Sequence, residues 1–287
     1  MQEPLANWNG SELPLSEVRV SVLDRGFLFG DSVYEVLRVY HGRPFLEREH
    51  MDRLRESLKE LRLSIDCARL ETRVHETLQH SRVTDGLIYI QVTRGEAPRM
   101  HHFPKPTPTP NELIWVKDLG GDPLASLRGK GATAILVEDQ RWKRCDIKST
   151  NLLANCLAAQ DAHEAGCEEA LLVADDGTIT EGSHTSVFGI ARGHLLTAPL
   201  EANILPGITR GLVLDLAEAA GIPCEEHALT RNNLWEIDEL FVTGTTAEVL
   251  PIIEVDQRAI AGGQPGPITK RLEAAYRAEV ERVCRPH

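Results

Sequence analysis

The chain has 287 residues, which is enough for one large domain or two of ordinary size. Hydrophobic residues make up 42% of it and charged residues 26%, and 31 basic side chains stand against 43 acidic ones, a formal net charge of −12. This composition is typical of a soluble globular protein, and the charge argues against broad binding to nucleic acids or anionic membranes without excluding a local basic pocket for a small anion.

The first part of the sequence predicts a mixture of strands and helices. Apolar residues at spacings of three and four, such as Met51, Leu54 and Leu58, indicate a helix. Runs of β-branched and aromatic residues bounded by turn residues indicate strands. In chain order we predict strands over residues 18–24 and 33–40, a helix over 46–61, a second helix marked by Leu70, Val74 and Leu78, and strands over 87–94 and 112–117.

Two irregular segments interrupt these elements. Residues 98–110 are rich in proline and histidine and predict a long ordered loop, a kind of segment that often carries function. In residues 118–123 a Gly-Gly pair and a nearby proline interrupt both the helical and the strand pattern of apolar residues. We therefore place an interdomain linker over residues 119–125. The expected domains are residues 1–118 and 126–287.

The second part again alternates strands and helices. Gly221 ends one of the predicted helices, with Pro223 shortly after it. The predicted elements are strands over residues 132–138 and 169–174, a helix over 151–165, a hairpin around 192–193, a helix over 208–220, strands over 239–243 and 252–256, and a helix over 268–283. We therefore expect a mixed α/β (α+β) fold with two domains. No Gly-x-Gly-x-x-Gly fingerprint or P-loop is present.

The cysteines and the N-terminal residues bear on the cellular compartment. The six cysteines include no Cys-x-x-Cys pair, and their spacing favours neither a zinc site nor a disulfide framework. The start of the chain has no basic region followed by an apolar one, and no apolar run approaches the roughly 18 residues that span a bilayer. We expect a cytoplasmic protein with free thiols and no membrane association.

Lys148 is the lysine with the most informative surroundings. It lies in the segment CDIKSTN, directly before an apolar helical pattern. A lysine whose stem is held beside apolar neighbours can lose its proton and act as an amine nucleophile. From the spacing alone, a solvated loop lysine is the default interpretation and a nucleophile is the alternative.

Three further segments could contribute to a site. Glu181 follows a predicted strand and turn, where an exposed strand-end carboxylate is the simpler interpretation. Residues 206–210 open a helix, and residues 243–246 end a strand in a hydroxyl-rich turn, so both could bind a phosphate group. Arg94, Arg99, His101 and His102 surround the long loop, where arginine would suit carboxylate recognition. No His-Glu-x-x-His motif occurs, so we expect no metal site.

Seven motifs occur in a specific order. They are DRGFLFGDSVYEV (24–36), YIQVTRG (89–95), PRMHHFP (98–104), DIKS (146–149), TEGS (180–183), GITR (207–210) and ELFVT (239–243). This ordered set resembles the fold-type IV pyridoxal-phosphate enzymes, which include branched-chain aminotransferases, D-amino-acid aminotransferases and aminodeoxychorismate lyases. The resemblance covers nearly the whole chain and looks closest to the bacterial D-amino-acid aminotransferases. It implies a two-domain architecture with the cofactor between the domains.

The resemblance implies a role for each candidate residue. Lys148 would hold pyridoxal 5′-phosphate as a Schiff base and move the proton at the substrate Cα. Glu181 would face the pyridine nitrogen and keep the ring protonated and electron-withdrawing. The other implied cofactor contacts are Arg53, Ile208, Thr209 and Thr245 at the phosphate and Leu205 at the ring. Without the family, a surface ion pair would be the interpretation of Arg53.

The resemblance also implies how the substrate is held. In the D-amino-acid enzymes an arginine and a histidine on the long loop, with a tyrosine from the first domain, bind the substrate α-carboxylate, and the matching residues are Arg99, His101 and Tyr34. In those enzymes the loop residues come from the neighbouring subunit, so the resemblance implies a homodimer. The branched-chain L-enzymes usually read Glu-Gly-x-Gly-x-Asn, which residues 181–186 do not match.

Four residues depart from the D-specific pattern. His184 stands where a serine is usual and Ser186 where an asparagine is usual, while Ser32 replaces a common glycine and Gly244 a common serine. These changes bear on the substrate range rather than on the cofactor chemistry.

The resemblance predicts a transaminase that acts on D-amino acids such as D-alanine, with a 2-oxo acid such as 2-oxoglutarate as acceptor. The first alternative is another enzyme on the same scaffold, either an L-branched-chain or amine aminotransferase or an aminodeoxychorismate lyase. The presence of both Arg99 and His101 argues against it. The second alternative is a catalytically silent binding protein, against which the presence of Lys148 and Glu181 argues.

Overall fold

The computed structural model describes residues 3–201 and 203–285, which form two compact units. The first unit comprises the chain up to Asp122, the segment Ile147–Asn151 and the chain from Arg282 onward. The second unit comprises Pro123–Asp146 and Leu152–Glu281. Lys148 therefore belongs to the first unit, although the boundaries expected from the sequence assign it to the C-terminal domain. The reason is that its segment is hydrogen-bonded to a strand of the first unit.

The first unit is built on one antiparallel sheet. The strands have the spatial order β2-β1-β6-β5-β3-β4, and every neighbouring pair is antiparallel. Its elements are β1 (Leu5–Trp8), β2 (Ser11–Pro14), the 3-10 turn η1 (Leu15–Glu17), α1 (Arg25–Phe29), β3 (Ser32–Tyr40), β4 (Arg43–Pro44), α2 (Glu47–Glu60), α3 (Cys67–Ser81), β5 (Gly86–Thr93) and β6 (Asn111–Asp118).

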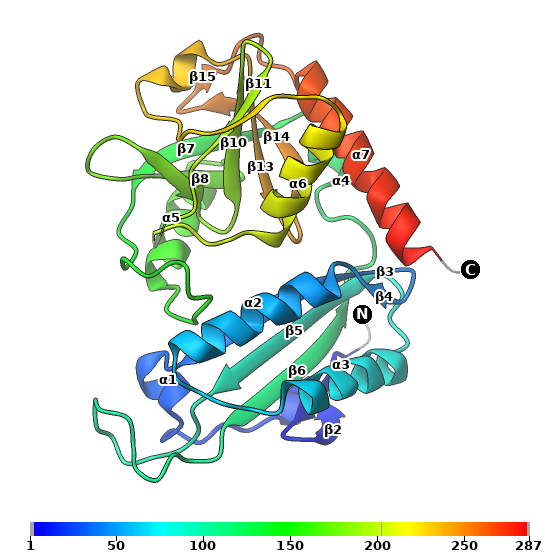
Figure 1. Cartoon of the computed structure of the whole chain (residues 1–287), viewed down its shortest axis with the longest axis vertical. Coiled ribbons are helices and arrows are strands. Elements are labelled where there is room, and N and C mark those ends of the chain that lie inside the picture. Colours follow the sequence, from blue (N-terminus) through cyan, green and yellow to red (C-terminus); the bar gives the residue numbers. More distant parts are fainter. Residues whose placement is uncertain (1–2, 202, 286–287) are drawn as a thin grey trace. The chain divides into compact units, whose positions relative to one another are not determined.

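Helices α2 and α3 lie along this sheet (Figure 1). Alternate residues of the strands, such as Val33 and Leu37 in β3 and Ile90 in β5, point to the helices. Leu54 of α2 and Leu70 of α3 belong to the same buried cluster. The predicted helices and the predicted strands over residues 33–40, 87–94 and 112–117 are thereby confirmed, because both apolar periodicities meet in one core.

The strand predicted over residues 18–24 is wrong. Val20 and Val22 are 47% and 69% exposed, and of these residues only Asp24 forms a bridge, an isolated one with Glu96. The Asp24 carboxylate instead accepts a hydrogen bond from the backbone N–H of Gly26 at 2.7 Å, which caps α1. The β-branched residues favoured a strand, but no neighbouring strand pairs with them.

The second unit contains a mixed nine-stranded sheet. Eight strands follow the order β12-β11-β10-β13-β14-β7-β8-β9, and β15 pairs with β14. Its elements, with the last helix continuing into the first unit, are α4 (Ala125–Arg128), β7 (Ala132–Glu138), α5 (Leu153–Glu164), β8 (Glu169–Val173), β9 (Ile179–Gly182), β10 (Ser186–Ala191), β11 (His194–Thr197), α6 (Ile208–Ala219), β12 (Cys224–Glu226), the 3-10 turn η2 (Asn233–Glu236), β13 (Glu239–Gly244), β14 (Glu248–Val255), β15 (Arg258–Ala259) and α7 (Pro267–Cys284).

Parallel and antiparallel pairs coexist in this sheet. Strands β7 and β8 are parallel and are connected through α5, whose Ala158 and Ala162 pack against Leu172 of β8. Strands β10, β13 and β14 are antiparallel. The mixed α/β class expected from the sequence is confirmed, and β14 begins at Glu248, earlier than predicted. No helix in the described part of the chain is long and apolar enough to cross a bilayer.

Candidate active site

The segment that carries Lys148 is fixed to strand β3. Ile147 belongs to the core of the first unit, and Ser149 forms an isolated bridge with Val33. The Tyr34 N–H donates to the Lys148 carbonyl at 3.0 Å, and the Lys148 N–H donates to Ser57 Oγ at 3.2 Å. The backbone of Lys148 is therefore held on both sides, which limits where its amine can reach.

The Lys148 amine lies against aromatic rings. Its Nζ is 4.3 Å from the centre of the Tyr34 ring, which stacks on Tyr89 with ring centres 5.7 Å apart. Trp115 continues the stack at 5.2 Å from Tyr89. Burial, with a contribution from Tyr34, raises the pKa of Tyr89 well above its usual value, so the Tyr89 ring stays uncharged. The structure thus brings together Lys148 and Tyr34, two of the residues singled out from the sequence.

Arg53 projects from α2 onto a buried carboxylate. Its Nε donates to Glu35 Oε1 at 2.7 Å and its Nη2 donates to Glu35 Oε2 at 2.9 Å. His50 Nδ1 is 2.7 Å from Glu35 Oε2. Glu35 lies on the apolar face of β3, so its charge needs partners from the helix that covers it. The two hydrogen bonds to Glu35 orient the Arg53 guanidinium.

The Glu35 and His50 pair predicts a pH-dependent stability. Burial by itself raises the pKa of Glu35, but Arg53 and His50 outweigh it and lower that pKa from 4.5 to about 2, while burial lowers the pKa of His50 below 6.5. For both groups the unfolded chain binds more protons, so stability falls as the pH drops below about 6.5. The Glu35 contribution, about 3 kcal/mol at neutral pH, is lost between about pH 5 and 2.

Unfolding by urea at pH 7, 5.5 and 4 tests this expectation. We expect Glu35→Gln to be less stable than the wild-type protein by about 3 kcal/mol at pH 7, because Arg53 loses its buried counter-charge. The variant should also lose less stability than the wild-type protein between pH 5.5 and 4. A variant with the wild-type dependence on pH would contradict this assignment.

Glu181 lies in β9 and is 5% exposed. Its Oε2 is ion-paired with Arg141 Nη1 and accepts a hydrogen bond from the Leu205 N–H at 3.2 Å. Arg141 also binds Asp139 through Nε and Nη2, at 2.9 and 2.8 Å. Burial lowers the pKa of Arg141, but Asp139 and Glu181 outweigh it and raise that pKa. One charged guanidinium thus stands between two carboxylates and forms an ion pair with each.

The start of α6 is arranged to receive an anion. The helix begins at Ile208 and Thr209 after Gly207, and no side chain caps its free N–H groups. A Cβ on Gly207 would lie 2.7 Å from Ser186 Oγ, so glycine lets the helix start approach this hydroxyl. Ser186 pairs with Thr243 in β13, whose buried hydroxyl has no hydrogen-bond partner among the described residues.

The turn that carries Thr245 follows β13 directly. Arg128, which is buried, donates from Nη1 to the Ala247 carbonyl at 2.5 Å and from Nη2 to the Thr246 carbonyl at 3.4 Å. Arg128 therefore holds this turn by its backbone. Gly207 at the start of α6 approaches Ser186 of β10, and β10 pairs with β13, which leads into the Thr245 turn. This connection between the helix start and the turn agrees with one anion site that uses both.

Arg99 and His101 lie on the exposed loop of the first unit. Both approach the ring of Phe29 at the end of α1. The Arg99 Cζ is 5.3 Å from the centre of that ring, and the ring centres of His101 and Phe29 are 5.6 Å apart. The structure therefore places these two predicted substrate residues around one aromatic side chain.

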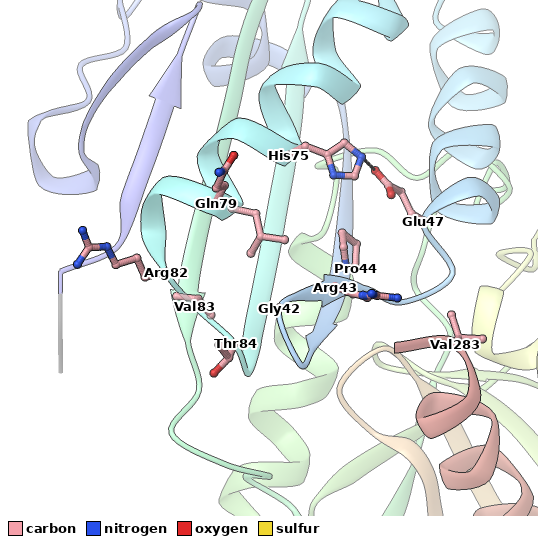
Figure 2. A pocket seen from close by; sticks show the side chains of 11 residues that line it. Gly42, Arg43, Pro44, Glu47, His75, Gln79, Arg82, Val83, Thr84 and Val283 are labelled. Carbon is pink, nitrogen blue, oxygen red and sulfur yellow. Dashed lines mark ion pairs between the residues drawn. The ribbon is translucent and has the colours of Figure 1, made fainter. Parts of the chain in front are cut away.

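An open hollow in the first unit lies beside β4 and the second half of α3 (Figure 2). It has a volume of about 730 Å³ and is lined by residues that include Arg43, Gln79 and Val283. The ion pair between His75 Nε2 and Glu47, 2.9 Å long, lies at its wall. None of the predicted site residues lines this hollow. Within residues 3–201 and 203–285, no group of three His, Cys, Asp or Glu side chains is arranged to hold a metal ion.

Sequence reasoning missed several partners of the predicted residues. Glu35 had a detectable signal, because a carboxylate between Val33 and Leu37 on the buried face of a strand must find a cation. Arg141 had none, because its partner Glu181 lies 40 positions further along the chain.

Comparisons with known proteins bear on the family to which this chain is related. A family model described as amino-transferase class IV matches residues 32–255. The chain is 40% identical to the D-alanine aminotransferase of Bacillus licheniformis and 38% identical to that of Staphylococcus haemolyticus, in each case over 95% of this chain and 96% of the relative.

Solved structures give the same picture of the fold. The branched-chain amino acid aminotransferase of Escherichia coli is similar with a TM-score of 0.89 and 28% identity, over 96% of this chain and 94% of that one. A T.th. branched-chain amino acid aminotransferase with pyridoxamine 5′-phosphate is similar with a TM-score of 0.88 and 29% identity, over 100% and 96% of the two chains.

Proposed function

The chain belongs to the class IV aminotransferase family, and from this premise we propose that it transfers the amino group of D-amino acids, such as D-alanine, to a 2-oxo acid such as 2-oxoglutarate. Its likeness to D-alanine aminotransferases over nearly the whole of both chains supports the reaction. The observation that carries the choice of D-amino acids is the pair Arg99 and His101 on one loop around Phe29, since this pair resembles the one with which the D-amino-acid enzymes bind the substrate α-carboxylate.

The residues present fit pyridoxal 5′-phosphate. Among the described residues, the start of α6 has no side-chain cap and the buried hydroxyl of Thr243 has no hydrogen-bond partner, which suits a phosphate group, and we assign Ile208, Thr209 and Thr245 to it. When bound, the cofactor supplies an aldehyde for the amino group and a ring that withdraws electrons from the substrate Cα. We further assign Arg53 to the phosphate and Leu205 to the ring.

Lys148 supplies the amine that holds the cofactor and moves the proton at the substrate Cα. In the first half-reaction its Nζ takes the proton from the Cα of the donor, and in the second it returns one to the Cα of the acceptor. The fixed backbone limits the reach of Nζ, which lies against the Tyr34 ring. Glu181 would accept a hydrogen bond from the protonated ring nitrogen of the bound cofactor, and Arg141 forms an ion pair with this carboxylate.

Substrate orientation depends on Arg99, His101 and Tyr34, which we assign to the α-carboxylate. We propose that the loop residues enter the active site of a second copy, which makes the enzyme a homodimer. Exposed apolar side chains on the first unit, including Val22 at 69% and Phe27 at 70%, support an interface with another chain. We assign the enzyme to the cytoplasm, in agreement with its free cysteines.

Single half-reactions test the proposed substrate class. The purified protein, loaded with pyridoxal phosphate, is mixed with D-alanine or with L-leucine in the absence of acceptor. We expect D-alanine to convert the aldehyde form of the cofactor to the amine form, followed by the absorbance change, and L-leucine to convert it far more slowly. Conversion by L-leucine alone would contradict the D-amino-acid assignment.

The second candidate function is transamination of L-branched-chain amino acids. The similarity to solved branched-chain amino acid aminotransferases favours it, because the scaffold is common to both. The same two-substrate experiment separates the candidates. Conversion by neither amino acid would point to an amine aminotransferase or a lyase on this scaffold.

A further inference from the structure

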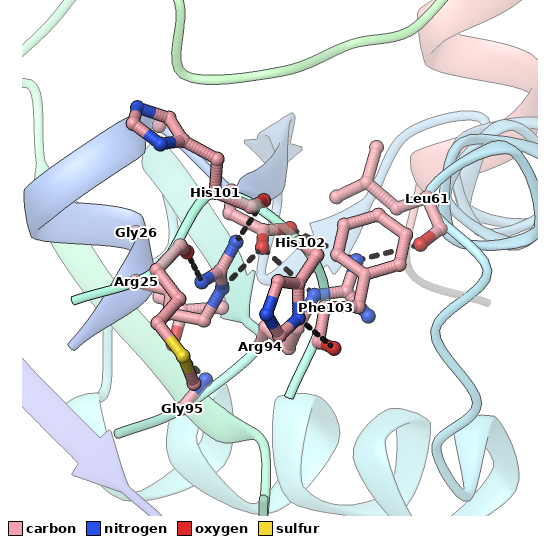
Figure 3. A network of polar contacts seen from close by, with 12 residues as sticks. Arg25, Gly26, Leu61, Arg94, Gly95, His101, His102 and Phe103 are labelled. Carbon is pink, nitrogen blue, oxygen red and sulfur yellow. Dashed lines mark hydrogen bonds and ion pairs between the residues drawn. The ribbon is translucent and has the colours of Figure 1, made fainter. Parts of the chain in front are cut away.

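The loop that carries Arg99 and His101 is exposed, yet its backbone is held by a buried side chain. Arg25, the first residue of α1, is 2% exposed. Its Nη1 donates to the Met100 carbonyl at 2.6 Å and its Nη2 donates to the His101 carbonyl at 3.4 Å (Figure 3). One guanidinium therefore donates hydrogen bonds to two consecutive carbonyls of the loop.

Asp31 fixes Arg25 from the other side. Arg25 Nε donates to Asp31 Oδ2 at 2.8 Å. Arg94, also 2% exposed, donates to the same carboxylate from Nε at 2.8 Å and from Nη2 at 2.9 Å. Arg94 Nη2 also donates to the Leu61 carbonyl at 2.6 Å. A single carboxylate thus joins two buried guanidinium groups, and the carbonyls of Met100, His101 and Leu61 accept further hydrogen bonds from them.

Aromatic rings complete this arrangement. The Phe103 ring of the loop lies over Arg94, with the Cζ atom 3.7 Å from the ring centre (Figure 3). Arg25 Cζ is 4.8 Å from the centre of the Phe29 ring, which is also the ring that Arg99 and His101 approach. The loop is therefore held at its backbone by Arg25 and at Phe103 by Arg94.

We propose that Arg25, supported by Asp31 and Arg94, is a positioning residue for recognition of the substrate carboxylate. Arg25 fixes the backbone at Met100 and His101, so the side chains of Arg99 and His101 are presented in one geometry. This inference rests on the proposed role of Arg99 and His101 in binding the substrate. A lysine could not replace Arg25, because its single ammonium group cannot reach Asp31 and both carbonyls in the planar geometry of a guanidinium.

The variant Arg25→Lys tests this inference, and Arg38→Lys is its matched control. Arg38 is 4% exposed, donates to the Gly86 carbonyl at 2.8 Å and pairs with Asp85 at 2.5 Å, but its partners lie in β3 and β5 and in the turn before β5, away from the loop. Both substitutions disturb a buried arginine that binds carbonyls and one carboxylate. Only Arg25→Lys should affect the loop.

The first measurement is the single-turnover half-reaction of the loaded enzyme with D-alanine. We expect Arg25→Lys to raise the apparent dissociation constant of D-alanine by about 10-fold or more, while the limiting rate changes less than about threefold. The reason is that a displacement of Arg99 and His101 weakens substrate binding more than it affects the proton transfer. Arg38→Lys should leave the dissociation constant at the wild-type value. An unchanged dissociation constant in Arg25→Lys would overturn the inference.

The second measurement does not depend on activity. Hydrogen exchange of the peptide spanning residues 97–104 should become faster in Arg25→Lys and stay at the wild-type rate in Arg38→Lys. If Arg25→Lys folds poorly, Phe103→Leu replaces it, because it removes the ring contacts of the loop with Arg25 and Arg94 and should raise the dissociation constant in the same direction. Failure of the wild-type protein to use D-alanine would refute the proposed substrate, whereas unchanged exchange in Arg25→Lys would refute the positioning role separately.

Discussion

Replacing Lys148 by alanine is expected to lower turnover by about 10⁴-fold or more, because it removes both the covalent attachment point and the group that moves the Cα proton. The backbone contacts of residue 148 to Tyr34 and Ser57 involve only main-chain atoms of the lysine, so the variant should keep the local fold. The measurement is transamination of D-alanine with 2-oxoglutarate, together with the fraction of cofactor that stays attached after borohydride reduction and denaturation. Both quantities should fall to background.

Lys143→Ala is the matched control for this variant. Lys143 is exposed and lies five positions before Lys148, so its loss should change neither turnover nor cofactor attachment. Turnover near the wild-type rate in Lys148→Ala would remove the lysine from the mechanism and with it the proposed reaction.

Replacing Glu181 by glutamine is expected to lower kcat by about 10²–10³-fold, a size typical of the loss of one preorganised electrostatic contact in an active site. Glutamine keeps the side-chain shape and can still accept the Leu205 N–H, but it removes the negative charge that lies beside Arg141. Without this charge the ring nitrogen is no longer held in its protonated form, and electron withdrawal from the substrate Cα weakens.

The kcat for D-alanine and the absorbance spectrum of the bound cofactor measure this effect. Glu168→Gln is the control, because Glu168 is an exposed carboxylate just before β8 and should leave both quantities unchanged. A Glu181→Gln variant with the wild-type kcat would show that the carboxylate does not act on the ring nitrogen.

Local patterns in the sequence predicted most of the fold correctly. The helix over residues 46–61 and the strand over residues 33–40 were recognisable because their apolar periodicities are complete within one element. The predicted strand over residues 18–24 failed because a strand needs a partner, and β-branched composition does not reveal whether one exists. The helix α1 was missed because it has only five residues and depends on the cap from Asp24.

The candidate site was less accessible to local reasoning. Spacing alone left Lys148 as a loop lysine and Glu181 as a strand-end carboxylate, and only the ordered set of motifs distinguished them. The motifs fixed residue identities but not their surroundings. The pairing of Glu181 with Arg141 and of Arg53 with Glu35 came from contacts between elements.

The sequence by itself determined the class of fold and the family, and it singled out the candidate site residues, because these depend on patterns along the chain. The tertiary structure decided that the Lys148 segment joins β3, that one guanidinium stands between Asp139 and Glu181, and that Arg25 holds the loop of Arg99 and His101. The physical reason is that a buried charge must be neutralised and hydrogen-bonded by whichever groups the fold brings within reach, and these lie far apart in the sequence.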